Sequence, residues 1–594
     1  MKSSDNRVNR GGGFLLGTPT ESFTPEKLSE EQQMVFRSSE EFVDREVWTR
    51  VEEMEGHNYE VTRSLLMRAG EMGLVGADIP MEFGGLGLDV VSSALIAESM
   101  GRGASFATTF GAHAGIGTLP IVYFGTEEQK KRFLPSLATA DRVASYALTE
   151  SDAGSDARNI QTRADLSSDE VNYVLNGTKQ WITNSGFADL FIVYAKVDGD
   201  KMTAFIVERD FEGVSIGPEA DKMGLNGTST CEVILRDVKV PVENTLGEIG
   251  RGHVIAFNIL NIGRFKLGAI CVGASKKVLS QTASYAKERR QFGKSISEFA
   301  AVKQKLAKMA SKIFVMESMV YRTAALAAEQ LKEAEGKDAS SIGRAIQEYA
   351  IESSICKIFG SETMDSAADE ALQIHGGYGY MKEFGIERAY RDARISRIFE
   401  GTNEINRLLI PATLMRRSLS GELPLMEAIG ILTQEITSFS LPSSGDVNPG
   451  PLDQAERDLD GVRKAALLVM GTAAQKYVAN PDDIPQELLM DIADLVSTVF
   501  SIESALLRTK MILKDQGESA ALNSLDCLTF YCEEAVPDSE RKTRRCIAAL
   551  SESDDLQIQI SVVRRFFRRN PVSIIGVGRR IADRVLEKEV YSAI

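Results

Sequence analysis

Ile398-Phe-Glu-Gly-Thr-Asn-Glu-Ile-Asn-Arg407 sets one carboxylate, Glu400, between an aromatic residue and a glycine. The pattern predicts a junction between a loop and a helix, which Thr402 or Asn403 would cap. A glutamate pressed against the preceding phenylalanine loses hydration, so its pKa should rise from about 4.3. That arrangement suits removal of a carbon-bound proton beside a flat ligand, which Gly401 would let approach the backbone. Alone, however, a glutamate before a helix is more often a charge that stabilises the helix N-terminus.

The chain around this stretch has the composition of an ordinary soluble protein. Its 594 residues suffice for more than one domain, with 43% hydrophobic and 26% charged residues. A formal net charge of −16 argues against nucleic-acid binding. The six cysteines and four histidines are scattered, so neither a disulfide framework nor a metal site is predicted. No stretch approaches the roughly 20 apolar residues that span a bilayer, and no targeting peptide is evident, so we expect a cytoplasmic protein.

Changes in periodicity divide the chain into five segments. The helical period over 28–142, the β-branched and aromatic runs in 143–248 and the returning helical period over 249–418 predict an α+β fold that is mostly α. A segment rich in Pro and Gly then predicts a linker over 419–455, followed by an appended helical domain over 456–594.

Four further motifs suit a flat, phosphorylated cofactor, although each has a simpler structural explanation. They are Tyr146 to Asp156, Trp181 to Thr183, Glu288 to Gly293 and Gln373 to Gly379. Their hydroxyls, indole, arginines and glycines could bind, stack on or approach such a ligand. The alternatives are a capped loop, a core tryptophan, solvated cations at a helix end and a turn after a helix. No GxGxxG follows a strand and no GxxxxGK[ST] occurs, so Rossmann and P-loop sites are not predicted.

A basic amphipathic stretch, Arg564-Arg-Phe-Phe-Arg-Arg569, lies near the end of this acidic chain, with Arg579 and Arg580 after it. A solvated helix face is the default interpretation of such a stretch. The alternative is attraction to an anionic membrane or partner, so peripheral membrane contact through the last domain stays open.

In this order the motifs resemble those of the acyl-CoA dehydrogenase family, from about residue 28 to 415. The matching signatures are A-L-T-E-x3-G-S-D (147–156), W-I-T (181–183), E-R-x-Q-F-G-K (288–294), Q-x-H-G-G-x-G-Y (373–380) and F-E-G-T-N (399–403). The extra C-terminal helices make the chain look like the very-long-chain branch. The resemblance implies an N-terminal helical domain, a middle β-barrel-like domain and a C-terminal four-helix bundle, with the appended helical domain after them.

The resemblance also implies a reaction. It is the FAD-dependent α,β-dehydrogenation of a long-chain fatty acyl-CoA to the trans-2-enoyl-CoA, the first step of fatty acid β-oxidation, with electrons passed to electron-transfer flavoprotein. Glu400 matches the base of the family; some relatives place it on an earlier helix, but no carboxylate occurs around Asn261 to Arg264. An acyl-CoA oxidase using oxygen and a non-catalytic assembly or scaffold protein on the same fold are the alternatives. A homodimer is expected from the resemblance.

Site residues follow from the resemblance by position. The implied FAD contacts are Tyr146, Leu148, Thr149, Gly154, Ser155, Trp181, Thr183, Arg289, Gln291, Phe292, Gln373, Gly376, Gly377, Thr402 and Glu404. Those from Arg289 to Gly377 would reach the FAD of a neighbouring subunit. The implied substrate contacts are Ser155, Asn261, Arg264, Gly111, Ala112 and Gly401. The small Gly111 and Ala112 would leave a deep apolar slot, which favours a long acyl chain.

Overall fold

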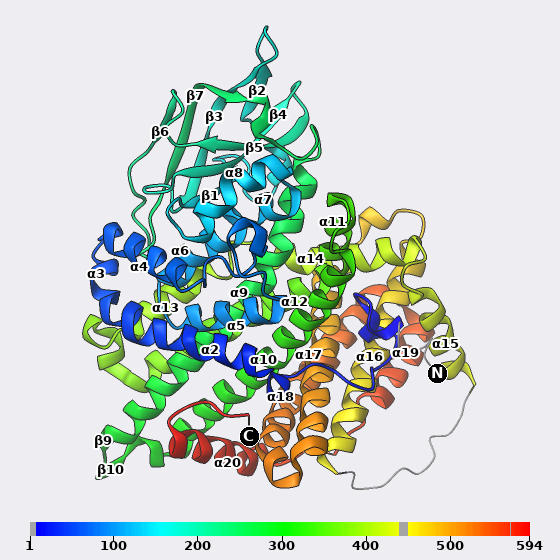
Figure 1. The fold of residues 1–594 in the computed structure, drawn as a ribbon. Coiled ribbons are helices and arrows are strands. Elements are labelled where there is room, and N and C mark those ends of the chain that lie inside the picture. The colour runs from blue at the N-terminus through cyan, green and yellow to red at the C-terminus, as the bar shows by residue number, and fades with distance from the viewer. Residues whose placement is uncertain (1–6, 439–449, 571, 594) are drawn as a thin grey trace.

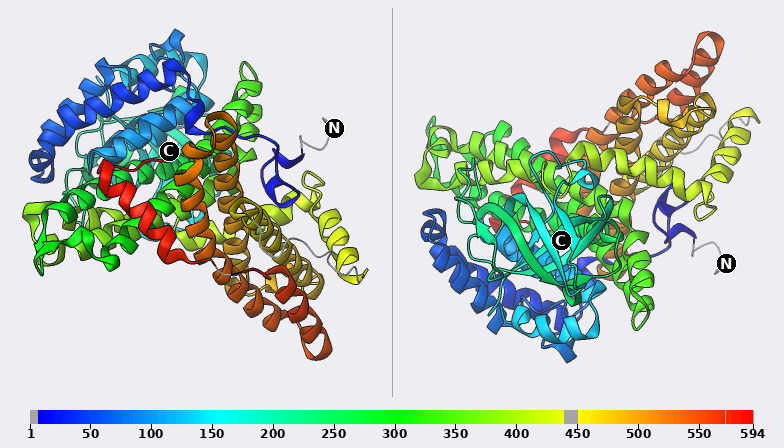
Figure 2. Two further views of the ribbon diagram at one scale, coloured as in Figure 1. Left: turned by 90° about the horizontal axis from the view of Figure 1, so that it is seen from below. Right: turned by 90° about the horizontal axis from the view of Figure 1, so that it is seen from above.

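The computed structural model of the chain describes residues 7–438, 450–570 and 572–593. Helices, a sheet, a second set of helices and an appended helical region follow one another along the chain. The sheet forms one end of the molecule, and the appended helices lie beside the second helical set (Figures 1 and 2). The predicted α+β, mostly helical fold is therefore confirmed.

The N-terminal domain is built of short helices, and side chains cap the N-termini of α2, α4, α5 and α8. Its α-helices are α2 (Glu30–Phe42), α3 (Val51–Glu55), α4 (Tyr59–Glu71), α5 (Val90–Gly101), α6 (Phe106–Phe110), α7 (Leu119–Phe124) and α8 (Glu127–Ala138). Ser29 and Thr126 each form a reciprocal capping box with a glutamine three residues later, at the starts of α2 and α8. Between α6 and α7, the segment η6 (Gly111–Gly117) winds as a wide π-helix.

The middle domain is a mostly antiparallel sheet with the order β6-β7-β3-β2-β4-β5-β8. The strands are β1 (Ala144–Ala147), β2 (Arg163–Leu166), β3 (Asn172–Thr183), β4 (Leu190–Val197), β5 (Lys201–Glu208), β6 (Val214–Ile216), β7 (Thr230–Pro241) and β8 (Thr245–Leu246). The β-branched and aromatic runs that predicted strands, residues 191–197, 203–207 and 231–235, lie in β4, β5 and β7. The short β1 pairs in parallel with β4, so the chain enters the sheet in its buried middle.

The second helical set is a bundle around one very long helix. It contains α9 (Gly252–Glu288), α10 (Ala300–Ala334), α11 (Ala339–Glu348), α12 (Ala350–His375), α13 (Ile386–Ile395) and α14 (Asn403–Leu419), with a hairpin of β9 (Arg290–Gln291) and β10 (Lys294–Ser295) after α9. Helix α9 packs against α5, α10 and α12, which bring the N-terminal domain and the bundle together.

Helix α9 is, within the described residues, the one helix long and apolar enough to cross a membrane by length and composition. The expectation that no stretch approaches bilayer length is therefore wrong. The apolar residues have another explanation here, because 67% of the most apolar window of α9 is buried inside the protein. Core helices that are surrounded by other helices have this composition.

The appended domain contains α15 (Leu425–Thr437), α16 (Pro451–Lys476), α17 (Gln486–Gln516), α18 (Glu518–Leu550), α19 (Ser553–Phe566) and α20 (Ile574–Lys588). The prediction of a linker over 419–455 is wrong in part, because α15 lies inside that range. Leu425 and Leu432 recur at helical spacing and are buried, which gives α15 an apolar face to pack against α16. Most of the Pro- and Gly-rich stretch, residues 441–449, lies outside the described residues.

Candidate active site

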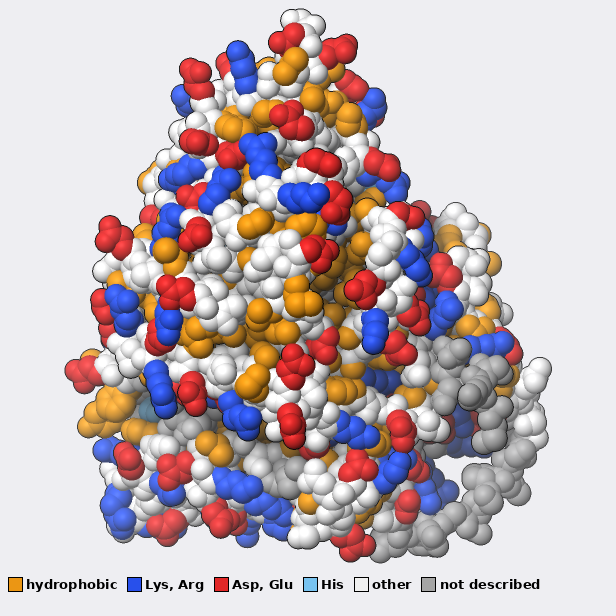
Figure 3. Space-filling model, viewed as in Figure 1, with side chains coloured by type: hydrophobic (Ala, Val, Ile, Leu, Met, Phe, Trp, Pro, Cys, Tyr) orange, Lys and Arg blue, Asp and Glu red, His pale blue; other side chains and the backbone are white. Residues whose placement is uncertain are grey.

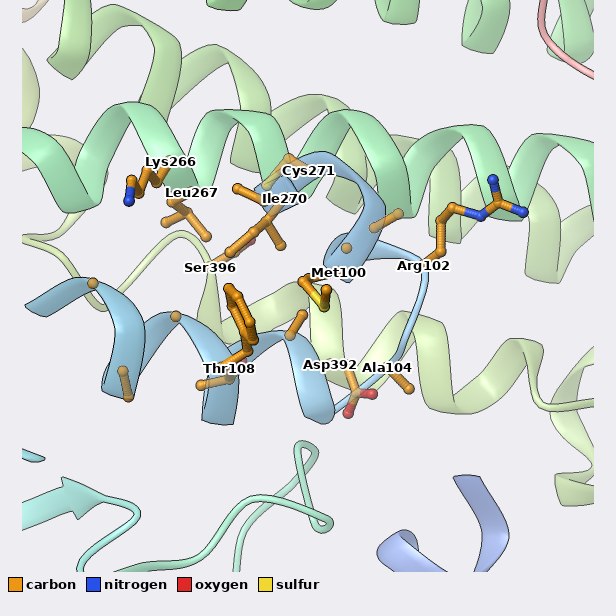
Figure 4. Close-up of a pocket in the computed structure, with 18 of the residues that line it drawn as sticks. Met100, Arg102, Ala104, Thr108, Lys266, Leu267, Ile270, Cys271, Asp392 and Ser396 are labelled. Carbon is orange, nitrogen blue, oxygen red and sulfur yellow. The ribbon is translucent and has the colours of Figure 1, made fainter. Parts of the chain in front are cut away.

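A cavity of about 200 Å³ lies where the N-terminal domain, the sheet and the bundle meet. Its walls come from α5, η6, α9 and α13, and Figure 4 shows the side chains that they contribute. Small and apolar residues dominate the lining, among them Ala97, Met100, Ala107, Gly111, Ala112, Leu267, Ile270 and Ala274. Glu400 is the only glutamate among the described residues that line it.

Glu400 lies in the loop between α13 and α14, residues 396–402, which we call the Glu400 loop. Its φ is 57° and that of Gly401 is 82°, so two successive residues are left-handed. A non-glycine residue in this region is strained and persists only where its surroundings hold it. The N-cap of α14 is Thr402, whose hydroxyl accepts from the backbone N–H of Ile405 at 3.2 Å. Thr402, and not Glu400, therefore caps α14.

A close approach of α9 makes room for the carboxylate. A Cβ at Gly263 would lie 2.7 Å from Oε2 of Glu400 and 3.0 Å from its Cδ. Any side chain at Gly263 would therefore displace the carboxyl group. The part of α9 around Gly263 carries no carboxylate of its own, and the carboxyl group of Glu400 lies against it.

Burial raises the pKa of Glu400 to about 7, although the positive charges of Arg264 and Lys357 act in the opposite direction. Oε2 is buried and has no hydrogen-bond partner in the described part of the chain. Tyr146 is the further titratable group that interacts with it. A carboxylate poised near neutral pH with a free oxygen has the properties of a general base.

Neither cation is hydrogen-bonded to the carboxylate, because both bind the loop backbone instead. Nε of Arg264 donates to the carbonyl of Glu400 at 3.2 Å. Nζ of Lys357 donates to the carbonyl of Gly401 at 2.8 Å and to Oδ1 of Asn403 at 2.7 Å. These bonds satisfy the loop carbonyls and leave the carboxylate free.

Lys357 is the site residue that the sequence did not reveal. It lies in the buried helix α12 with no exposed surface, and burial lowers its pKa to about 8. One feature of the sequence could have revealed Lys357: it is the only charged residue in the run Ser353 to Gly360. A lysine in such a run needs partners, because an unpaired buried charge is costly.

The sheet supplies a second side of the site from β1 and β3. Thr183, the last residue of β3, lines the cavity. Trp181 lies in an irregularity of the β3–β7 pairing with a φ of 57°, and 61% of its surface is exposed. The alternative of a core tryptophan is therefore wrong. The backbone N–H of Gln180 donates to the carbonyl of Thr149 at 2.8 Å and joins this strand to the segment after β1.

Tyr146, in β1, is half-buried; in the segment after β1, Leu148 is buried, and Gly154 and Ser155 are exposed. A Cβ at Gly154 would meet no atom within 4 Å. Apart from Thr183, none of the predicted cofactor contacts of the sheet lines the cavity itself. Of these residues, Gly154, Ser155 and Trp181 are exposed on the same domain.

The remaining predicted cofactor contacts lie elsewhere. Arg289, Gln291, Gly376 and Gly377 line a second open groove, which shares no described lining residue with the cavity. Phe292, in the β9–β10 hairpin, is 92% exposed, and Gln373 is exposed on α12. The hairpin is far from the sheet (Figure 1). One chain therefore does not bring these residues to Glu400.

The predicted substrate contacts are also divided. Gly111 and Ala112 line the cavity, and Arg264 and Gly401 adjoin Glu400. Asn261 instead lines a smaller neighbouring cavity, and its Oδ1 accepts from Nη1 of Arg264 at 2.8 Å. It therefore orients Arg264. Ser155 does not line the cavity, and Glu404 is exposed in the first turn of α14.

Comparison with known proteins finds acyl-CoA dehydrogenase domains over most of the chain. Sequence models of the acyl-CoA dehydrogenase N-terminal, middle and C-terminal domains match residues 29–141, 145–238 and 250–415. A further acyl-CoA dehydrogenase C-terminal domain matches 461–565.

Individual relatives agree with the family match. A probable acyl-CoA dehydrogenase of Bacillus subtilis (strain 168) is 48% identical over 98% of this chain and 99% of its own. The crystal structure of an acyl-CoA dehydrogenase complexed with FAD from Bacillus anthracis has a TM-score of 0.95 and 47% identity, covering 98% of this chain and 100% of that one. The mitochondrial very long-chain specific acyl-CoA dehydrogenase of Homo sapiens is 41% identical over 57% of this chain and 51% of its own. The chain belongs to the acyl-CoA dehydrogenase family.

Proposed function

We propose that the chain is an FAD-dependent dehydrogenase of long-chain fatty acyl-CoA that forms the trans-2-enoyl-CoA, as in the first step of fatty acid β-oxidation. The observation that carries the proposal is Glu400, whose free carboxylate, with a pKa of about 7, lies at an apolar cavity. A fatty acyl thioester fits such a cavity, and Glu400 would remove its C2 proton as hydrogen bonds to the thioester carbonyl stabilise the developing enolate.

In this proposal Glu400 takes the proton from C2 of the thioester and becomes the neutral acid. When bound, FAD supplies the oxidant that takes up the hydride from C3, so that the C2–C3 bond becomes double. The backbone N–H of Glu400 donates no hydrogen bond within the described residues, so it is free to polarise the thioester carbonyl. Arg264 and Lys357 hold the loop in place while the proton moves.

The residues of the sheet fit a flavin. An indole exposed at 61% on a left-handed residue is unusual for a strand, and it offers a flat stacking face at Trp181. Thr183 lines the cavity, so its hydroxyl can bond the edge of a ring. Thr149, Gly154 and Ser155 offer hydroxyls and open backbone for phosphate. Thr402 and Glu404 would contribute from the start of α14.

The length of the cavity supports a long acyl chain. The residues of α9 that line it run from Ile262 to Gln281, roughly 29 Å of helix at 1.5 Å per residue. A bilayer core about 30 Å thick holds two acyl layers, so one long chain reaches roughly 15 Å. The cavity is therefore deep enough, and Gly111 and Ala112 do not obstruct it.

Steady-state kinetics test this function. We expect kcat/KM to be higher for palmitoyl-CoA than for butyryl-CoA, because each additional buried methylene contributes about 0.8 kcal/mol. A higher value for butyryl-CoA would contradict the long-chain proposal.

Electrons are proposed to pass to electron-transfer flavoprotein, since the relatives that match the whole chain are named dehydrogenases. Stoichiometric peroxide during turnover in air would instead identify an oxidase.

We also propose a homodimer. Around the second groove, exposed aromatic and apolar side chains gather: Phe292, Tyr378, Tyr380, Met381, Phe384 and Tyr390. Figure 3 shows hydrophobic side chains at the lower left edge, where this segment lies. Patches of this kind on a soluble protein usually mark an interface. A second copy that covers it would carry Arg289, Gln291, Phe292, Gln373, Gly376 and Gly377 towards the FAD of its neighbour.

Replacing Phe292 with aspartate is expected to give monomers in light scattering and to lower the FAD content of the purified protein. The new charge would have to be buried in the interface without a partner, which costs several kcal/mol. Val478→Asp, which changes another exposed apolar residue remote from this groove, serves as the control. A Phe292→Asp protein that stays dimeric and keeps its FAD would contradict the proposal.

Two further proposals concern the location of the protein in the cell and its contact with a membrane. We propose a cytoplasmic location with peripheral membrane contact through Arg564, Arg565 and Arg568, which are exposed at the end of α19. Arg569 is less available, because it binds the carbonyl of Cys532 and the carboxylate of Glu533. A purely structural assembly protein is disfavoured, since such a role needs no strained carboxylate with a free oxygen.

A further inference from the structure

The backbone of the Glu400 loop is held by a buried lysine and the first residue of α14. Nζ of Lys357 bridges the carbonyl of Gly401 at 2.8 Å and Oδ1 of Asn403 at 2.7 Å. Lys357 and Asn403 are both almost wholly buried, so water cannot replace either bond. Arg264 and Asn406 also bind carbonyls of the loop, and the Lys357 bridge makes the position of Gly401 depend in addition on where Asn403 is held.

Asn403 is held in turn by two residues of α12: Ser361, whose Oγ accepts from Nδ2 of Asn403 at 3.1 Å, and a glutamate. Nδ2 of Asn403 donates to Oε1 of Glu362 at 3.1 Å. The same carboxylate accepts two bonds from Arg407, at 2.8 Å to Oε1 and 3.1 Å to Oε2. Arg407 lies four residues after Asn403, one helical turn further along α14. Glu362 therefore binds the first and the second turn of α14 to α12.

The guanidinium of Arg407 has a second carboxylate partner, and this one belongs to the appended domain. Nε of Arg407 donates to Oδ1 of Asp494 on α17 at 2.7 Å. Nζ of Lys542 on α18 binds the other oxygen of Asp494 at 2.8 Å. The Arg407, Asp494 and Lys542 side chains are only 13%, 21% and 18% exposed. An unbroken series of polar contacts thus joins α17 and α18 to the carbonyl of Gly401.

We propose that Asp494 is a positioning residue for the dehydrogenation, through which the appended domain fixes the Glu400 loop. The inference rests on the proposed function, in which Glu400 is the base. Asp494 touches neither substrate nor cofactor and acts by holding Arg407, which holds Glu362 and Asn403. A left-handed Glu400 needs such support, because a strained residue relaxes when its surroundings loosen.

Removing the charge of Asp494 would leave Arg407 with a single carboxylate and Lys542 without this partner. Arg407 and Glu362 could then shift together, and Asn403 with them. A displacement of about 1 Å in a reacting group can cost about 100-fold in rate. The base would also become more hydrated, which moves the pKa of Glu400 back towards its ordinary value.

The test uses Asp494→Asn in the full-length holoenzyme, with Asp494→Glu as the conservative variant. The matched control is Asp583→Asn, which removes another ion pair between the appended domain and the bundle, that of Asp583 on α20 with Lys303 on α10. We expect Asp494→Asn to lower kcat for palmitoyl-CoA about 10- to 100-fold and to change KM by less than about threefold. The rise of kcat/KM with pH should move to lower pH. Asp494→Glu should recover most of the activity, and Asp583→Asn should behave as wild type.

An Asp494→Asn enzyme with wild-type kcat and an unmoved pH profile would overturn the inference. So would equal losses in Asp494→Asn and Asp583→Asn that follow their thermal stabilities, since this indicates general destabilisation. Should Asp494→Asn not fold, Lys542→Met keeps the contact of Asp494 with Arg407 while removing its anchor, and the same readouts decide. Undiminished turnover by Glu400→Gln would instead refute the proposed function, whatever Asp494 does.

Discussion

Glu400→Gln is expected to lower kcat for palmitoyl-CoA by about 10²- to 10⁴-fold, the usual contribution of a general base. The amide has the shape of the carboxyl group but cannot accept the C2 proton. Because Gly263 leaves space for a group of this size, the loop should not move. Stopped-flow and steady-state turnover measure the effect, and unchanged FAD content is the control. Turnover within about tenfold of wild type would exclude Glu400 as the sole base.

The same variant has an expected signature in stability. The pKa of Glu400 is raised in the folded state from 4.5 to about 7, so its ionisation weakens folding as pH rises through that range. Glu400→Gln should therefore be more stable than wild type at pH 8, by up to about 3 kcal/mol, and the difference should vanish below about pH 4.5. In wild type, kcat/KM should rise with pH through about 7, because the carboxylate is the active form and kcat/KM reports the pKa of the free enzyme. Denaturant titrations at the two pH values check the first expectation.

Gly111→Phe is expected to convert the chain-length preference. Gly111 has an ordinary helical backbone and a Cβ there would lie 3.7 Å from Cδ1 of Ile270, so a side chain can be added without strain. Its ring would fill the cavity beyond the thioester end. If about four methylenes can no longer enter, the loss is about 3 kcal/mol, or roughly 200-fold in kcat/KM for palmitoyl-CoA.

Butyryl-CoA should be used by the Gly111→Phe variant as well as by wild type, since a short chain does not reach the ring. Gly430→Phe, which adds the same side chain at an exposed glycine of α15, controls for the phenylalanine itself. Equal losses for the two substrates would mean that the ring disturbs the reacting end. Retained activity on palmitoyl-CoA would mean that the acyl chain takes another path.

Much of this site could be predicted because its chemistry is written in short local patterns. Taken alone, the glutamate between an aromatic residue and a glycine was ambiguous, and the resemblance carried by the ordered motifs singled out Glu400. The same motifs predict cofactor contacts at Thr149, Trp181 and Arg289. Periodicity was enough to separate the sheet from the two helical regions. The Pro- and Gly-rich stretch before it also indicated most of the appended domain, which was predicted over 456–594.

What the sequence did not reveal depends on contacts between distant segments. Lys357 resembles any lysine of a helix until α12 is packed beside the Glu400 loop. The link from Arg407 to Asp494 joins residues 87 positions apart and has no local signature. Helix α15 was missed because the Pro- and Gly-rich stretch after it extended the predicted linker too far. The apolar composition of α9 became intelligible only when its neighbours were known.

The most direct measurement is anaerobic addition of palmitoyl-CoA to the purified protein while the visible absorption of the flavin is recorded. The proposed function requires bleaching in wild type, and no bleaching on the same timescale in Glu400→Gln with equal FAD content. No bleaching in wild type, or equal bleaching in both proteins, would contradict the assignment of Glu400 as the base of an acyl-CoA dehydrogenase.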